Sequence, residues 1–303
     1  MGNGHYGKRW RQLLVILFIV VAGNDARLAA AVPTLERIRQ TGTLRVGYGN
    51  TPPFSWRGPD AVTGYSIELC QRVAESIRRR MGLEKINIDY VFRTAANRVQ
   101  LLDNGEIDIE CVASTNTEER RRNVSFSIGY FLVNTRYISL RKNQLRTLED
   151  LRGRSVSIVL GTNNVAQINQ VNREKKLNLS VVATDTLQQA FDMVTQEQVS
   201  AFAMDDILLH ALRARATHPQ DYVISDETLD TETEYGFMMR RDDEAFRNAV
   251  NDALRQIYHS NEIHQIYARW FTQPLPGSQI TLHFPMSENL RRLFNTTSSG
   301  APP

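Results

Sequence analysis

The stretch from Arg98 to Arg120 reads RVQLLDNGEIDIECVASTNTEER and changes its pattern three times. Apolar residues at helical spacing come first and end at Asn104-Gly105, a typical helix stop. Residues 107–112 then form an apolar run of strand length, and Ser114 to Thr117 are polar. Ligands of open α/β sheets bind beyond the carboxyl ends of the strands. The polar residues after this strand are therefore expected to line a binding site.

The segments before this stretch extend the same alternation. Leu44 to Tyr48 is a short apolar strand, residues 65–80 carry a helical apolar face, and residues 86–92 alternate as a strand does. Thr94 is placed to cap the helix that follows. The order β-α-β-α-β predicts a mainly parallel sheet with helices on its faces, which is an α/β fold.

A second region repeats this plan further along the chain. Strands are predicted at residues 155–160, 179–183 and 200–204, and helices are predicted between them at residues 164–175 and 187–196. The last strand ends at Asp205, and Gly161-Thr162 follows the first. Two lobes of similar architecture are therefore predicted, with polar residues at equivalent strand ends.

Two long stretches without internal turns are suited to carry the chain between the lobes. They are Tyr130 to Leu140 and Thr231 to Met239, and two helices after them, at residues 244–259 and 262–271, are expected to pack on the first lobe. The predicted division is lobe 1 at 32–134 and 235–293, lobe 2 at 135–234 and a flexible tail at 294–303.

The composition excludes several classes of protein. The 303 residues are 42% hydrophobic and 23% charged with a formal net charge of +3, as in ordinary globular proteins, and basic residues are scattered among acids. Nucleic acid is therefore not an expected partner. Three basic residues precede an apolar run at residues 13–22, and Ala29 and Ala31 match a cleavage signal. A cleaved signal peptide at 1–31 and a periplasmic, soluble protein are predicted, because the apolar run is about half the ~20 residues that span a bilayer.

The chemistry-bearing motifs of enzymes and metal proteins do not occur in the sequence. The six histidines lack metal-ligand spacing, and Gly47-Tyr48-Gly49 lacks the third glycine of a dinucleotide-binding loop. No metal and no cofactor is therefore expected. The two cysteines, Cys70 and Cys111, are either paired in a disulfide or separate buried thiols, and the sequence leaves both readings open.

The ordered series of motifs resembles the extracellular solute-binding proteins of family 3, and within them the glutamate/aspartate-binding proteins of ABC importers. The resemblance runs from about residue 35 to about 293 and is carried by GYS at 64–66, the stretch at 98–120, FS at 126–127, GT at 161–162 and AFAMDD at 201–206. It implies a type II periplasmic-binding-protein fold with two hinge crossings. It also implies a monomer that passes an amino acid to a membrane permease.

The same resemblance implies the roles of individual residues. Arg120 would bind the α-carboxylate of the ligand with help from Thr115 and Thr162, Asp205 would bind the α-ammonium group, and Arg98 would hold an acidic side chain. Ser114, in the polar stretch after the strand, is a further candidate for ligand binding. The chain departs from the glutamate/aspartate branch at two places. Ala113 stands where that branch has a ligand-binding serine, and the loop at residues 49–51 has no basic residue.

The predicted function is thus the binding component of an amino-acid importer, with glutamate or aspartate favoured, and not an enzyme. The main alternative is a periplasmic enzyme on the same fold, similar to cyclohexadienyl dehydratase, which would need a general acid in the cleft. The acids expected there are Asp205 and Asp206. The sensing domain of a receptor is a third reading, disfavoured because no membrane-spanning or signalling segment follows the predicted lobes.

Overall fold

A computed structural model describes residues 1–2 and 32–298 of the chain. The compact unit begins at Pro33 and contains every helix and strand of the described residues. The predicted signal peptide therefore lies outside the described residues, except for the first two. Among the described residues, no helix combines the length and the apolar character needed to cross a membrane.

The first lobe is built on a five-stranded sheet with the order β4-β1-β5-β14-β6. Strands β4, β1 and β5 are parallel, and β14 runs antiparallel to both β5 and β6. The bounds are β1 Thr43–Tyr48, β4 Asn87–Phe92, β5 Ile109–Glu110, β6 Val124–Phe126 and β14 Met238–Arg240.

The second lobe repeats this plan in a sheet with the order β10-β9-β11-β8-β12. Its first three strands are parallel, and β8 is antiparallel to both β11 and β12. The bounds are β8 Thr135–Leu140, β9 Ser155–Val159, β10 Ser180–Thr184, β11 Ala201–Asp205 and β12 Tyr222–Ile224. In each sheet, the fourth position is taken by a strand that has just crossed from the other lobe, which confirms the predicted two-lobed α/β fold.

Two short strands join the lobes. The first crossing contains β7 (Phe131–Val133) and the second contains β13 (Thr233–Tyr235), and these two strands pair antiparallel as a sheet of their own. Aromatic side chains fix this crossing on the first lobe, because Phe54 contacts the rings of Phe131, Tyr235 and Phe271 at centroid distances of 5.0, 5.3 and 5.8 Å. The crossing strands are therefore anchored in the largest hydrophobic core.

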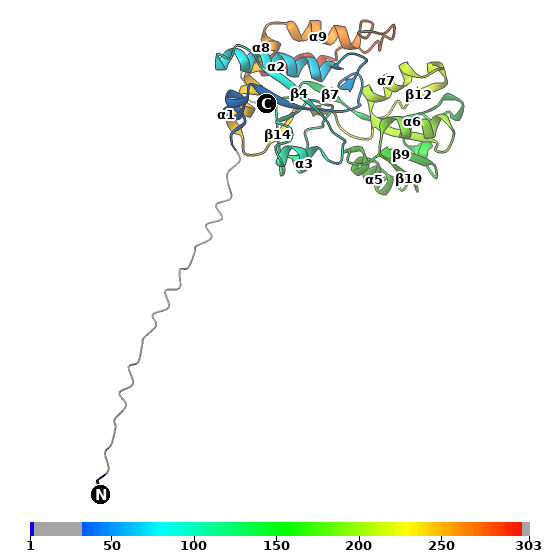
Figure 1. The fold of residues 1–303 in the computed structure, drawn as a ribbon. Helices are drawn as coiled ribbons and strands as arrows, with labels where there is room; N and C mark the ends of the chain where they lie inside the picture. Colours follow the sequence, from blue (N-terminus) through cyan, green and yellow to red (C-terminus); the bar gives the residue numbers. More distant parts are fainter. Residues whose placement is uncertain (3–31, 299–303) are drawn as a thin grey trace. The chain divides into compact units, whose positions relative to one another are not determined.

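Helices cover the sheets and carry the loops of the cleft. Figure 1 shows α2, α8 and α9 together over the first sheet, and α5, α6 and α7 around the second. Helix α2 is typical: Leu69, Val73 and Ile77 are buried on one face, and Gly82 ends the helix in a left-handed conformation. The helices are α1 Thr34–Thr41, α2 Tyr65–Met81, α3 Arg98–Asp103, α4 Glu118–Arg121, α5 Asn164–Glu174, α6 Leu187–Thr195, α7 Asp206–Arg215, α8 Glu244–His259, α9 Glu262–Phe271 and α10 Glu288–Ser298.

Short elements complete the chain. They are the hairpin strands β2 Trp56–Arg57 and β3 Val62–Thr63 and the 3-10 turns η1 Arg141–Asn143, η2 Glu149–Leu151 and η3 Pro219–Asp221. Cys70 on α2 and Cys111 after β5 are joined in a disulfide, which decides between the two readings of the sequence.

Two local predictions were wrong. The strand expected at residues 107–112 is reduced to Ile109–Glu110, because the N–H of Arg45 on the neighbouring β1 donates to the side chain of Asp108 at 2.7 Å. Thr94 does not cap α3, which begins at Arg98, but accepts from the N–H of Asn97 in the preceding turn. Residues 294–298 of the predicted tail belong to α10, and residues 299–303 lie outside the described residues.

Candidate functional site

A cavity of about 300 Å³ lies between the two lobes. The loops that follow β1, β4 and β5 form one wall, and the residues after β9 and on α6 and α7 form the other. Arg93 and Arg98 contribute positive charge from the first lobe, while Met204 and Leu208 contribute apolar surface from the second. The cavity thus has two arginines on its first-lobe wall and a mixed second-lobe wall that includes Asp185 and Arg215, at the carboxyl ends of the parallel strands.

Arg98 is the first residue of α3, and its side chain is only 5% exposed. The guanidinium donates to the Ser114 hydroxyl at 3.3 Å and to the Gly161 carbonyl of the second lobe at 2.8 Å. Burial, with the nearby positive charge of Arg120, lowers the pKa of Arg98 to about 9. The side chain is still charged at neutral pH. Because burial disfavours this positive charge, an anion in the cavity would stabilise it.

Arg120 lies on α4, whose start is capped by the Thr117 hydroxyl accepting from the Arg120 N–H at 3.2 Å. Its guanidinium donates to the carbonyl of Thr115 at 2.9 Å and to that of Gly161 at 3.3 Å. Burial lowers the pKa of Arg120, against the opposing attraction of nearby carboxylates. One carbonyl of the second lobe therefore accepts from two arginines of the first.

Gly161 can approach the first lobe because it has no side chain. Its φ is +75°, in the left-handed region, and a Cβ there would lie 2.9 Å from the carbonyl oxygen of Ala95. A larger residue would clash with the first lobe in this arrangement. Gly161, in the turn after β9, is thus a point of direct contact between the lobes.

Arg93 and Glu110 form a buried ion pair that the sequence reasoning missed. Their nearest nitrogen and oxygen are 2.6 Å apart, and the side chains are 5% and 0% exposed. The same Glu110 oxygen accepts from Ser114 at 3.0 Å. The position of Arg93, directly after the strand predicted at residues 86–92, was the available signal, since it marks the same sheet edge as Ser114.

Asp205 ends β11 in the second lobe and is 5% exposed. One carboxylate oxygen accepts from Asn164 at 2.8 Å, and the other accepts from the hydroxyl of Tyr235 on the crossing strand β13. Burial raises the pKa of Asp205, against these hydrogen bonds and the charge of Arg120. The acid therefore links the second lobe to the crossing.

Two of the six predicted site residues line the cavity, and the other four lie behind its wall. Arg98 and Thr162 line the cavity, and Thr162 also donates to the carbonyl of Val159 at 2.7 Å. The other predicted residues surround that wall and bond to its members, to Gly161 or to the crossing; they are Ser114, Thr115, Arg120 and Asp205. All six predicted residues thus lie where the lobes meet. Arg98, Ser114, Thr115 and Arg120 share one hydrogen-bond system with Arg93, Glu110 and Gly161, while Asp205 and Thr162 bond to other groups.

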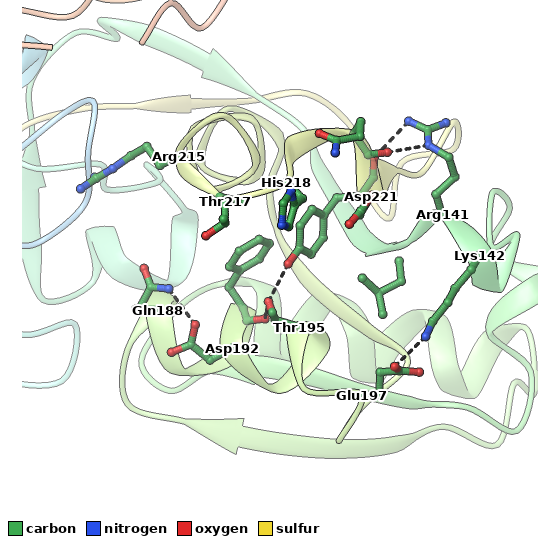
Figure 2. Close-up of a pocket in the computed structure, with 15 residues that line it drawn as sticks. Arg141, Lys142, Gln188, Asp192, Thr195, Glu197, Arg215, Thr217, His218 and Asp221 are labelled. Atoms are coloured by element: carbon green, nitrogen blue, oxygen red, sulfur yellow. Dashed lines mark hydrogen bonds and ion pairs between the residues drawn. The ribbon is translucent and has the colours of Figure 1, made fainter. Parts of the chain in front are cut away.

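A larger hollow of about 1020 Å³ lies on the second lobe, between α6, η1 and η3 (Figure 2). Its polar groups bond to one another: Lys142 pairs with Glu197 at 2.6 Å, and Gln188 donates to Asp192 at 2.8 Å. The basic and acidic side chains that line it are equal in number, so it carries no net formal charge. This hollow offers no buried unpaired charge and is a weaker ligand site than the cleft.

Among the described residues, no group of three or more His, Cys, Asp or Glu side chains could hold a metal ion. The buried carboxylates of the cleft are engaged by arginine, tyrosine or amide donors instead. The arrangement is that of a site for a small charged organic ligand.

Comparison with known proteins gives consistent matches over most of the chain. Residues 44–273 match the family described as bacterial extracellular solute-binding proteins, family 3. A protein of Pseudomonas aeruginosa called L-glutamate/L-aspartate-binding protein is 35% identical, with 88% of this chain and 89% of that protein covered. The glutamate/aspartate import solute-binding protein of Escherichia coli is 28% identical, with 95% and 96% covered.

Solved structures show the same fold. A mutant of ArgBP from T. maritima has a TM-score of 0.69 at 24% identity and covers 79% of this chain and 99% of its own. An ancestral amino acid-binding protein described as a precursor of cyclohexadienyl dehydratase has a TM-score of 0.66 at 25% identity, with 78% and 99% covered. The relatives named here are binding proteins, while the last also marks a connection to an enzyme.

Proposed function

The chain belongs to the bacterial extracellular solute-binding proteins of family 3, and on this premise we propose that it binds glutamate or aspartate between its lobes and delivers it to the permease of an ABC importer. The relatives from Pseudomonas aeruginosa and Escherichia coli carry this ligand class in their names. The single observation that carries the proposal to this chain is the excess of buried positive charge in the cleft.

That excess follows from counting the charged groups of the site. Arg93, Arg98 and Arg120 face two carboxylates, those of Glu110 and Asp205, and the charges of Asp185 and Arg215 in the cavity lining cancel. The formal charge of these groups is therefore +1. Glutamate and aspartate carry two carboxylates and one ammonium group, a net charge of −1, and neutralise this excess. A neutral amino acid would leave a buried guanidinium without a counter-charge, which is costly.

The proposed roles follow from the positions of these groups. Arg120 binds the α-carboxylate, Asp205 binds the α-ammonium group, and Arg98 binds the side-chain carboxylate. Thr115, Thr162 and Ser114 support this cradle from the loops around it. On binding, the ligand carboxylates take over donors that Arg98 and Arg120 give to the Gly161 carbonyl.

The remaining parts of the proposal concern the whole chain. Residues 1–31 act as a cleaved export signal, residues 32–134 with 235–293 and residues 135–234 close on the ligand as two lobes, and the protein works as a monomer. N-terminal sequencing of the exported protein is expected to begin near Val32. A membrane-bound chain that retains Met1 would contradict the cleaved signal.

Turnover of the ligand is not part of the proposal. Asp205 and Asp206 are the acids that an enzyme of this fold would use here. Asp205 accepts from Asn164 and Tyr235, and Asp206 accepts from the N–H of Ile207. Incubation with prephenate and with arogenate is expected to give no product. Formation of product at a rate above that of an Asp205→Asn, Asp206→Asn variant would favour the enzyme instead.

Isothermal titration of the mature protein, unfolded and refolded to remove bound ligand, tests the binding proposal. Glutamate or aspartate is expected to bind more tightly than glutamine, asparagine, arginine or cystine. Arg120→Ala and Asp205→Ala are each expected to weaken that binding at least about thirtyfold, since losing one partner of a buried charged contact costs about 2 to 5 kcal/mol.

Two matched controls separate these effects from general damage. Arg121 is the exposed neighbour of Arg120 on α4. Its guanidinium donates to the side chain of Asn116 at 2.8 Å. Asp221 is an exposed acid of the second lobe. Arg121→Ala and Asp221→Ala are expected to bind as the wild type does. Tighter binding of a neutral amino acid than of either acid by the wild type would refute the proposed ligand.

A further inference from the structure

Arg93 is a charged residue of the cleft to which the proposed function assigns no contact with the ligand. It follows β4 directly, its side chain lines the cavity, and it is 5% exposed. The guanidinium lies against Gly49 in the loop after β1, where a Cβ would be 3.4 Å from the Arg93 Cζ. That loop, residues 49–52, has no basic side chain of its own. Arg93 therefore brings positive charge to a part of the wall that the loop leaves uncharged.

The carboxylate partner of Arg93 is shared. One oxygen of Glu110 accepts from Arg93 at 2.6 Å and from the Ser114 hydroxyl at 3.0 Å, and Ser114 in turn accepts from Arg98 at 3.3 Å. One carboxylate thus orients two guanidinium groups. The Arg93 Nε and the second Glu110 oxygen are buried without a hydrogen-bond partner within the described part of the chain.

From this geometry we propose that Arg93 is a second specificity-determining residue, which binds the side-chain carboxylate of the ligand together with Arg98. Glu110 is the positioning residue that holds both guanidinium groups toward the cavity. The inference rests on the proposed function and deepens it, because it assigns two bases to the distal carboxylate. A carboxylate has two oxygens and accepts from two forks, whereas an amide presents one acceptor and a donor that both arginines repel.

The competing explanation is that Arg93 and Glu110 are a structural ion pair that never touches the ligand. Arg93→Met alone cannot separate the two, since it leaves Glu110 buried without its partner and destabilises the lobe. The double variant Arg93→Met, Glu110→Gln removes one positive and one negative charge together. It keeps the formal charge of the cleft unchanged and leaves no buried ion orphaned.

Titration of glutamate and glutamine into the double variant is therefore the decisive experiment. If Arg93 binds the ligand, the ratio of glutamate to glutamine affinity is expected to fall at least tenfold from its wild-type value, with glutamine affinity changed less than threefold. Arg93→Lys, which keeps the charge and loses the fork, is expected to give an intermediate ratio. The control is Arg57→Met, an exposed arginine of the same lobe that stacks on Tyr48, 5.1 Å from the ring centre.

Each outcome bears on the inference. A double variant that folds, by circular dichroism and thermal unfolding, and keeps the wild-type ratio would overturn the role of Arg93 and leave the proposed function standing. A wild type that binds neither glutamate nor aspartate would overturn both. A reduced ratio in the double variant and an intermediate ratio in Arg93→Lys, which keeps Glu110 and so the orientation of Arg98, with an unchanged ratio in Arg57→Met, would support the assignment.

Discussion

Replacing Asp206 by asparagine is expected to stabilise the protein at neutral pH and not at acidic pH. Asp206 opens α7 next to Asp205, and one of its carboxylate oxygens accepts from the N–H of Ile207 at 2.7 Å. Burial, with the charge of Asp205, raises the pKa of Asp206 from 3.8 to about 6. A raised pKa in the folded state favours the protonated form, so the stability from this group is complete below about pH 4 and is lost as the pH rises through 6.

The size of the effect follows from the shift. About two pKa units correspond to a ceiling of about 3 kcal/mol, at 1.36 kcal/mol per unit. Asparagine keeps the acceptor for Ile207 and cannot ionise. The difference in unfolding free energy between variant and wild type is therefore expected to be near zero at pH 4 and to reach about 1 to 3 kcal/mol in favour of Asp206→Asn above pH 7.

Urea unfolding of both proteins at pH 4, 5, 6, 7 and 8, followed by circular dichroism, measures this difference. Asp103→Asn is the control, because Asp103 is exposed at the end of α3 and its substitution is expected to change stability by less than about 0.5 kcal/mol at each pH. A difference that does not vary with pH, or a wild type that is the more stable protein at pH 8, would refute the reasoning.

Three further predictions concern stability. Cys70→Ala with Cys111→Ala is expected to lower the unfolding free energy by about 4 kcal/mol, from the loop entropy of a 41-residue separation, and an unchanged urea midpoint would contradict this. Burial lowers the pKa of His210 to about 4, so stability is expected to fall as the pH drops from about 6.5 to 4, and His210→Gln is expected to flatten that pH profile in thermal unfolding. The Phe284 ring centre lies 5.2 Å from that of His210 on α7 and 6.3 Å from that of Phe131 on β7. Phe284→Ala is expected to lower the unfolding free energy, measured with urea, by about 2 kcal/mol. A decrease of less than about 0.5 kcal/mol would show that these contacts are unimportant for stability.

The parts of the fold that were predicted from sequence are those with local signals. The helices at Glu244–His259 and Glu262–Phe271 were placed with their observed bounds, because their apolar faces repeat at helical spacing. The strand at 107–112 was overestimated, since the Asp108 carboxylate bonds to Arg45 from the neighbouring strand and to the guanidinium of Arg37. No local pattern reveals such a tertiary contact.

The same limit applies to the site. The strand ends located Arg98, Arg120 and Asp205 at the interface of the lobes, whereas the Arg93–Glu110 pair joins two strands, β4 and β5, that lie on either side of β1. Their side chains meet across the end of β1 because of the strand order, which sequence periodicity does not specify.

Gly161 connects ligand choice with the contact between the lobes. Its carbonyl accepts from both Arg98 and Arg120, so two charged side chains share one neutral acceptor. Under the proposed function, an acidic amino acid exchanges this acceptor for two carboxylates, whose negative charges attract the guanidinium groups as a neutral carbonyl does not. An amide side chain replaces one neutral carbonyl with another and gains nothing from the exchange at Arg98. The preference for the acid over the amide therefore depends on the neutral acceptor that the arginines give up as much as on the ligand that replaces it.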